Sequence, residues 1–392
     1  MKTILSQRTE CFPTPEQKQY IEQCFGLRRF FFNKALMTLK HKYGDLREHR
    51  KEIKKSEVMN LKRDLFRAEY YSWVRSVSFH VMDSAMADLC QALDHLWKKG
   101  KDIKLRKKKS NNTFRIFASG IKEDGTNTTF SYEPGLKYVR IAKMGWLKMA
   151  ETLRWENGAI KTITIKKEAE RYFISLSVEL PDADVPRRGN KTNKHLGIDW
   201  GLKTYIVAFD GEDVLTADFD EGKMKRLDRK IAKHQKSLAR KKMNSNNWLK
   251  AKTKLQQSYL DFNNYRHNCV KQLAHEIDQA YDSVTLEDLG MTFVTRNRRL
   301  AHRTKQKPFY LLKEILVNKF ALTGKPVYQT PKAYPSTQLC SACGNRKEGK
   351  DKLKLSDRKY TCQCRGLAID RDENAARNIW ECRGLELVTL ED

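Results

Sequence analysis

Three acidic residues that lie far apart in the sequence carry side chains that could together hold metal ions. Asp199 lies in the segment LGIDWG, Glu287 in VTLEDLG and Asp372 in IDRDENAARNI. Any one of them alone is weak evidence, because an Asp before a helix is usually a cap and a Glu at a strand end is usually solvated. Together they supply the hard oxygen ligands that a pair of Mg²⁺ ions needs, roughly 3.5 to 4 Å apart, to cleave a phosphodiester.

Each of these acids lies where a predicted element begins or ends. A short apolar strand with glycines on both sides carries Asp199, and a hairpin should follow it. A second strand, 282–286, should deliver Glu287 at its end, after a long helical segment at 223–280 with a break at 244–247. Asp372 should lie at or just before the N-cap of a helix. The predicted metal site thus combines three separate elements.

Four cysteines in two close pairs predict a second kind of metal site. Cys340 and Cys343 form a C-x2-C pair, and Cys362 and Cys364 form a C-x-C pair after an insert of 18 residues. Four ordinary reduced thiols are the alternative, which this clustering disfavours. Four thiolates fit one tetrahedral zinc without an open position, so the zinc should be structural. The other five cysteines are expected to be small buried apolar residues: Cys11, Cys24, Cys90, Cys269 and Cys382.

The charge of the chain predicts a polyanionic partner. Lys and Arg number 77 against 48 Asp and Glu, a formal net charge of +29. Nucleic acid is the natural partner, because each neutralised phosphate releases counterions. The sequence contains no apolar run long enough to span a bilayer, and MKTILSQRTECF lacks the apolar core of a signal peptide. Nine cysteines, four of them clustered, favour a reducing compartment, so we expect a cytoplasmic protein without a membrane partner.

Two basic segments are candidate phosphate-binding sites, although a charge run is more often a solvated loop. The first is KKGKDIKLRKKK at 98–109 and the second follows Glu287. The candidate residues are Lys98, Lys99, Lys101, Lys104, Arg106, Lys107, Lys108 and Lys109 in the first segment, and Arg296, Arg298, Arg299 and Arg303 in the second.

The motifs GIDWG, LEDL, C-x2-C…C-x-C and DRDENAARN resemble those of the TnpB proteins of bacterial insertion sequences, the apparent ancestors of miniature type V CRISPR nucleases. The resemblance continues in PTPEQK at 13–18, FGLRRFFFN at 25–33 and YPSTQLCSACG at 334–344, so it spans nearly the whole chain in family order. It implies an RNA-guided DNA endonuclease that cuts next to a short recognised motif. The implied partners are a guide RNA, either an omega RNA or a CRISPR RNA, and double-stranded target DNA. One chain per guide is expected, with a dimer as the alternative.

The resemblance also implies an α/β multidomain fold. Residues 1–12 and 113–190 would form a β-barrel that carries an inserted helical recognition lobe at 13–112. Residues 191–335 and 365–392 would form a RuvC-type, RNase H-like nuclease domain, and 336–364 a zinc-ribbon insert that binds target nucleic acid. The family motif favours Asp372 over Asp370 as the third ligand, with Asp370 as a turn residue.

Three alternatives remain at this point. A miniature type V CRISPR effector would use the same fold with a CRISPR RNA. A guide-directed repressor that binds without cutting would lack one of the three acids, yet all three are present. A transposase would need a tyrosine nucleophile beside a His-x-His motif, which the sequence does not contain.

Overall fold

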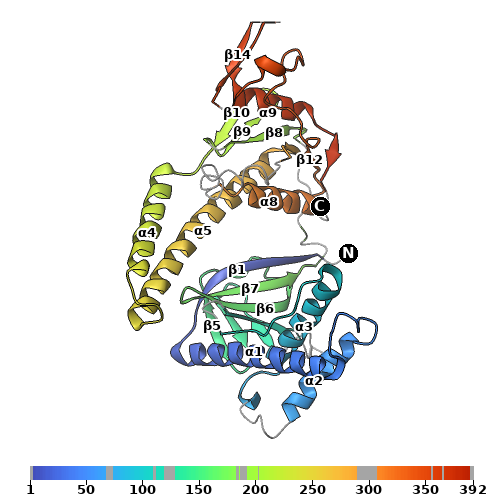
Figure 1. Cartoon of the computed structure of the whole chain (residues 1–392), viewed down its shortest axis with the longest axis vertical. Helices are drawn as coiled ribbons and strands as arrows, with labels where there is room; N and C mark the ends of the chain where they lie inside the picture. Colours follow the sequence, from blue (N-terminus) through green and yellow to red (C-terminus); the bar gives the residue numbers. More distant parts are fainter. Residues whose placement is uncertain are drawn as a thin grey trace. The chain divides into compact units, whose positions relative to one another are not determined.

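The structure is a computed structural model that describes residues 3–67, 74–108, 112–118, 129–181, 185, 192–201, 203–288, 307–354, 356–363 and 366–388. The chain divides into two units, Met1–Val185 and Pro186–Asp392. Each has its own sheet and helices (Figure 1). No described helix is both long enough and apolar enough to cross a membrane.

The first unit is built on an antiparallel sheet of seven described strands in the order β2-β6-β7-β1-β5-β4-β3. Three described helices lie between β1 and β2 in the chain. The elements are β1 (Ile4–Phe12), α1 (Pro15–Tyr43), α2 (Lys55–Arg67), α3 (His80–Lys99), β2 (Asn112–Phe117), β3 (Phe130–Tyr132), β4 (Tyr138–Ile141), β5 (Gly145–Met149), β6 (Ala159–Glu168) and β7 (Arg171–Glu179).

The predicted β-barrel is not closed, because among the described residues no hydrogen-bonded register joins the edge strands β2 and β3. Side chains of two helices occupy the outer edge of β2 instead. The backbone N–H of Arg115 donates to Ser84 Oγ of α3 at 3.2 Å, and Arg28 of α1 donates to the Thr113 carbonyl at 2.7 Å. These bonds satisfy edge groups that a closing strand would otherwise pair.

Local sequence signals set the ends of several elements in this unit. Thr14 and Gln17 form a capping box that starts α1 at Pro15, and Gly100 ends α3 in the left-handed conformation. The turn between β6 and β7 is tight: the two strands leave only Ala169 and Glu170 between them, both with positive φ. Two such residues make the turn that matches the twist of a hairpin.

The second unit contains a mixed sheet in the order β10-β9-β8-β11-β12-β15 and a separate hairpin of β13 and β14. The β8, β11 and β12 strands are parallel, whereas β9, β10 and β15 are each antiparallel to their neighbours. The elements are β8 (His195–Trp200), β9 (Ile206–Phe209), β10 (Val214–Ala217), α4 (Glu221–Ala239), α5 (Asn246–Ala280), β11 (Ser283–Leu286), α8 (Phe309–Leu322), β12 (Val327–Gln329), a 3₁₀ turn (Gly349–Asp351), β13 (Lys359–Cys362), β14 (Leu367–Asp370), α9 (Arg371–Glu381) and β15 (Glu386–Leu387).

Both faces of the central strand β8 are covered. Leu196, Ile198 and Trp200 alternate along the strand and share a core with apolar residues of α5 and α8. The opposite face meets α9, where Ala376 packs with Val207 and Phe209 of β9. All six residues of β8 are therefore buried, and Asp199 lies on the same side of the strand as α9. In Figure 1, α9 and the α5–α8 pair lie on opposite sides of this sheet.

The two helices predicted at 223–280 are present, with a break slightly earlier than predicted. Residues 240–245 connect them, and Asn246 and Asn247 already belong to α5. Ser245 caps the start of α5 by accepting a hydrogen bond from the Trp248 N–H at 3.2 Å.

Candidate carboxylate and cysteine sites

The structure brings Asp199 and Glu287 together at adjacent ends of two parallel strands. Leu286 of β11 is in register with Ile198 of β8, and the Glu287 N–H donates to the Ile198 carbonyl at 3.4 Å. The register therefore places Glu287 beside Asp199, and the two carboxyl groups interact electrostatically. Strands that run the same way deliver residues at their C-terminal ends to a common edge.

Burial and mutual repulsion dominate the electrostatics of this pair. Asp199 is 4% exposed. Burial raises the pKa of Asp199 well above its usual range, and the charges of Glu287 and Asp372 raise it further. Burial also raises the pKa of Glu287. Two buried carboxylates side by side are unfavourable unless a proton or a cation compensates them, so the pair suits cation binding.

Neighbouring polar groups hold Glu287 in position. Ser336 Oγ donates to its Oε1 at 3.1 Å, and Trp200 Nε1 donates to its backbone carbonyl at 3.1 Å. The next residue is also fixed, because the Asp288 N–H donates to Thr330 Oγ1 at 3.0 Å. The sequence analysis did not single out Ser336, which lies inside the motif YPSTQLCSACG.

Asp372 is the second residue of α9 and not its cap, which corrects the predicted helix start. Asp370 is the N-cap: its Oδ1 accepts from the Asp372 N–H at 2.8 Å and the Glu373 N–H at 3.4 Å. Asp372 is 17% exposed and pairs with Arg371 at 3.1 Å and Arg358 at 3.6 Å. Its charge contributes to the raised pKa of both Asp199 and Glu287, which places it near the pair.

The three acids converge without forming a tight cluster. In the described part of the chain, no three carboxylate or imidazole ligand atoms lie within 4.8 Å of one another.

Gly197 permits the approach of α9, and hence of Asp372, to β8. A Cβ at Gly197 would lie 2.4 Å from the backbone nitrogen of Trp380 and 2.6 Å from its Cα. Trp380 Nε1 donates to the His195 carbonyl at 3.2 Å, which fixes the helix over the strand. Ala375 and Ala376 of α9 are fully buried. The sequence analysis missed the role of Trp380.

The cysteine site contains three described ligands whose geometry fits zinc. The Sγ atoms of Cys340, Cys343 and Cys362 all lie within 4.8 Å of one another, and those of Cys343 and Cys362 are 3.8 Å apart. Sulfurs bound to one tetrahedral zinc at about 2.3 Å would be separated by about 3.8 Å. Tyr360 of β13 donates to the Gln338 and Asn345 carbonyls, which ties the two halves together. Cys364 lies outside the described residues.

Of the remaining cysteines, Cys11, Cys24 and Cys382 are buried as predicted, whereas Cys90 and Cys269 are only partly buried.

The predicted phosphate-binding residues differ in their surroundings. Six of them are exposed: Lys98, Lys99, Lys101, Lys104, Lys107 and Lys108. Arg106, by contrast, is half-buried and ion-paired with Asp88 at 2.9 Å, so it also has a structural role. Lys109, Arg296, Arg298, Arg299 and Arg303 lie outside the described residues.

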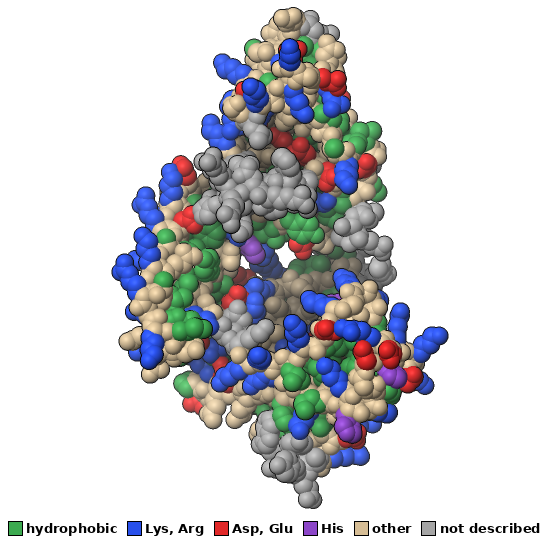
Figure 2. All heavy atoms as spheres, viewed as in Figure 1, with side chains coloured by type: hydrophobic (Ala, Val, Ile, Leu, Met, Phe, Trp, Pro, Cys, Tyr) green, Lys and Arg blue, Asp and Glu red, His purple; other side chains and the backbone are tan. Residues whose placement is uncertain are grey.

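A further basic surface lies on α4, where Figure 2 shows a row of Lys and Arg side chains. Its exposed basic residues are Lys223, Lys225, Arg226, Arg229, Lys230, Lys233 and Lys236, and only Ile231 of this helix is buried. This exposure fits the polyanionic partner that the net charge of the chain predicts.

Comparison with known proteins identifies three matching families along the chain. A family described as "Probable transposase" matches residues 175–298, "Cas12f1-like, TNB domain" matches 309–379, and "Helix-turn-helix domain" matches 1–48. The carboxylates Asp199 and Glu287 fall in the first match, and the cysteine site and Asp372 fall in the second.

Similar proteins cover nearly the whole chain. A Streptomyces pristinaespiralis protein named "Putative RNA-guided DNA endonuclease" is 28% identical over 94% of this chain and 86% of its own. The Escherichia coli protein "Putative RNA-guided DNA endonuclease InsQ" is 24% identical, over 97% and 92% respectively.

A solved structure, "Cryo-EM structure of the Cas12f1-sgRNA-target DNA complex", has a similar fold, with a TM-score of 0.55 at 12% identity over 96% of this chain and 98% of that one. Its likeness supports an α/β multidomain fold with a TNB domain. Taken together, the family matches and the full-length relatives support the assignment of this chain to the TnpB family.

Proposed function

We propose that this protein is an RNA-guided DNA endonuclease that cuts double-stranded DNA next to a short flanking motif. The observation that carries the proposal is the convergence of Asp199, Glu287 and Asp372 from β8, the end of β11 and the start of α9. The names of the full-length relatives agree with it. Since all three acids are present in the sequence, a nuclease fits better than a repressor that only binds.

The second unit would then be the RuvC-type, RNase H-like nuclease domain, with Asp199, Glu287 and Asp372 as ligands of two Mg²⁺ ions. Ions bound there would supply an activated water and would stabilise charge on the leaving oxygen. The chain contributes a rigid frame: β8 is buried on both faces, and Ser336 orients Glu287. Asp372 would exchange its contacts with Arg371 and Arg358 for a metal ion.

The cysteine site would hold one structural zinc through Cys340, Cys343, Cys362 and Cys364. With four thiolates it would have no open position for substrate, so it would stabilise the C-terminal region and take no part in cleavage. Because the proposed substrates are nucleic acids, we expect the protein to act in the cytoplasm of a prokaryote, at the nucleoid when bound to DNA.

The test begins with sequencing of the RNA that copurifies with the protein. Double-stranded DNA that matches this guide, with a randomised flank, is then incubated with the complex and Mg²⁺. Wild type should cut it, and Asp199→Asn should cut more than about 100-fold more slowly, because even groups that only support metal ligands cost 10- to 100-fold. Target binding should change by no more than about twofold, since the proposed ligand acts on the reaction and not on docking.

The matched control is Asp213→Asn, which removes an exposed carboxylate in the same unit and should leave cleavage unchanged. Near wild-type cutting by Asp199→Asn would overturn the site. Copurified RNA that directs no cutting by the wild type would overturn the guided activity.

A further inference from the structure

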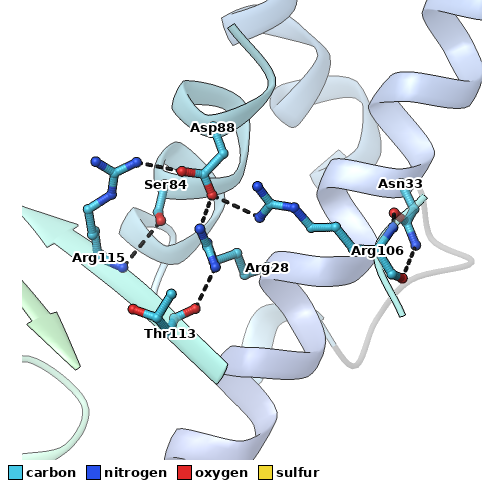
Figure 3. A network of polar contacts seen from close by, with 7 residues as sticks. All are labelled: Arg28, Asn33, Ser84, Asp88, Arg106, Thr113 and Arg115. Atoms are coloured by element: carbon cyan, nitrogen blue, oxygen red, sulfur yellow. Dashed lines mark hydrogen bonds and ion pairs between the residues drawn. The ribbon is translucent and has the colours of Figure 1, made fainter. Parts of the chain in front are cut away.

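A buried carboxylate in the first unit gathers three arginines around it (Figure 3). Asp88 of α3 is 6% exposed and pairs with Arg28 of α1, with Arg106 at 2.9 Å and with Arg115 of β2 at 2.5 Å. Three guanidinium groups surround one carboxylate, so among the residues that the structure describes the cluster carries two more positive charges than negative ones. Buried charges are normally paired one for one, and such an excess is costly without a further anion.

Arg28 experiences this excess most directly. Its side chain is 15% exposed, and its Nε is buried without a hydrogen-bond partner in the described part of the chain. Burial lowers the pKa of Arg28 to about 10, and repulsion from Arg106 and Arg115 acts in the same direction, while Asp88 opposes it. An additional anion beside the Arg28 guanidinium would therefore be stabilised there.

Beside this cluster lies a hollow of about 480 Å³ with an unusually basic lining. Five basic side chains border it: Arg28, Arg29, Lys104, Arg106 and Lys107. Among the described residues that line it, none is acidic. Arg29, Lys104 and Lys107 form no ion pair with any residue that the structure describes.

The guanidinium groups at this hollow are held in place before any ligand arrives. Arg28 donates to the Thr113 carbonyl at 2.7 Å. Asn33 binds both backbone groups of Arg106, at 2.7 and 3.0 Å, and the Arg106 guanidinium lies 3.8 Å from the centre of the Phe32 ring. A preorganised guanidinium loses little freedom when it binds, and its planar donors match phosphate oxygens. The geometry thus has the features of an anion site and not only of a packing contact.

We propose that this hollow binds a backbone phosphate of nucleic acid, with Arg28 and Arg106 anchored by Asp88 at its base and Lys104 and Lys107 at its rim. Only the natural source of the phosphate, a nucleic acid, rests on the proposed function. The chemistry itself is that of a phosphate monoanion or dianion, and inorganic phosphate can probe it without guide or target.

The first experiment measures the thermal stabilisation of the full chain by inorganic phosphate, against sodium chloride at the same ionic strength. The variant is Lys104→Ala with Lys107→Ala, which removes two exposed charges at the rim. The control is Lys18→Ala with Lys40→Ala, an equal charge change at exposed positions on α1. The rim variant should require about tenfold more phosphate for the same shift in Tm, because hydrogen bonds to charged groups are lost. The control should match wild type, and a response equal in all three proteins would overturn the site.

The second experiment identifies the source of the phosphate. A 20-nucleotide single-stranded RNA and a DNA of the same sequence are titrated between 50 and 200 mM salt. The rim variant should bind one or both about tenfold more weakly, and the slope of log K against log salt should fall by about 0.7 for each lost phosphate contact. If the rim variant responds less to inorganic phosphate in the first experiment but binds RNA and DNA as tightly as wild type, the hollow is an adventitious ion site only. That result would overturn the assignment to a backbone phosphate. Both outcomes are independent of DNA cleavage, so failure here is distinct from failure of the proposed function.

Discussion

At the scale of single residues, burial of the carboxyl pair Asp199 and Glu287 favours the binding of protons or cations. Burial and repulsion raise the pKa of both groups, so they bind protons at a higher pH than ordinary carboxyl groups do, and these protons would compete with Mg²⁺. At a pH below the ordinary pKa of carboxyl groups, the raised pKa values contribute fully to the stability of the metal-free protein. This contribution is lost as the pH rises through the pKa values of the folded protein. Metal affinity should accordingly increase with pH as the pair ionises.

Asp370 and Asp372 can be separated by a paired substitution. Asp370→Asn should keep the N-cap, because Asn and Asp are nearly equivalent in that position. It should therefore cut guide-matched DNA at close to the wild-type rate. Asp372→Asn retains the size of the side chain but loses its charge, so a metal ligand would be lost and cleavage should fall by more than about 100-fold. Cleavage in Mg²⁺ measures both, and the reverse ranking would move the third ligand to Asp370.

His195 should make stability dependent on pH. It is 2% exposed between Ser283 Oγ, at 2.8 Å from Nδ1, and Thr285 Oγ1, at 3.0 Å from Nε2. Burial, together with the charge of Arg383, lowers the pKa of His195 to about 4. The unfolded chain therefore binds a proton near pH 6.5 that the folded chain refuses, and stability is lost as the pH falls from 6.5 towards 4, by up to roughly 3 kcal/mol.

Urea unfolding at pH 7.5 and pH 5 measures this loss. The comparison of wild type with His195→Gln separates the effect of His195 from that of Asp199 and Glu287. The raised pKa values of those two carboxyl groups act in the opposite direction. The difference in unfolding free energy between the two proteins should shrink at pH 5, whereas a constant difference would contradict the assignment.

At the scale of elements, the site depends on how closely α9 approaches β8. Gly197→Ala would place a methyl group 2.4 Å from the backbone of Trp380, which cannot rotate away as a side chain could. The helix must shift, at a cost of about 1–3 kcal/mol, and Asp372 shifts with it. We expect a lower Tm together with a loss of cleavage.

Gly26→Ala is the control for this substitution. It adds the same methyl group within α1, where the nearest neighbouring side-chain atom, on Arg29, is 4.0 Å away. It should leave cleavage intact and raise stability by about 0.5–1 kcal/mol, because alanine favours a helix. Equal behaviour of the two alanine variants would show that the contact between α9 and β8 does not position the site.

At the scale of the whole molecule, each large hydrophobic cluster draws its described residues from one unit. Two separate cores predict two transitions in calorimetry. Removal of zinc by a chelator, or Cys343→Ser, should lower only the transition of the second unit, since the cysteines lie there. Metal analysis should find about one zinc per chain before treatment. A zinc-free preparation with the same two transitions would contradict the assignment.

The sequence by itself determined the features that depend on neighbours along the chain. A short apolar run between glycines marked β8, the helical pattern at 223–280 marked α4 and α5, and the spacing of the cysteines marked a zinc site, because composition, period and ligand spacing are local properties. Net charge likewise indicated a nucleic-acid partner without any knowledge of the fold.

Only the tertiary structure decided which distant groups meet. The register of β11 against β8 placed Glu287 beside Asp199. The hydrogen bonds that Arg28 and Ser84 form with the backbone of β2 occupy the edge of an open sheet. Packing of the first unit also makes Arg106, which the sequence presents as one charge in a basic run, an ion-pair partner of Asp88. Such pairings depend on long-range packing, in which a shift of one residue turns a side chain to the other face, and no spacing within a single segment encodes them.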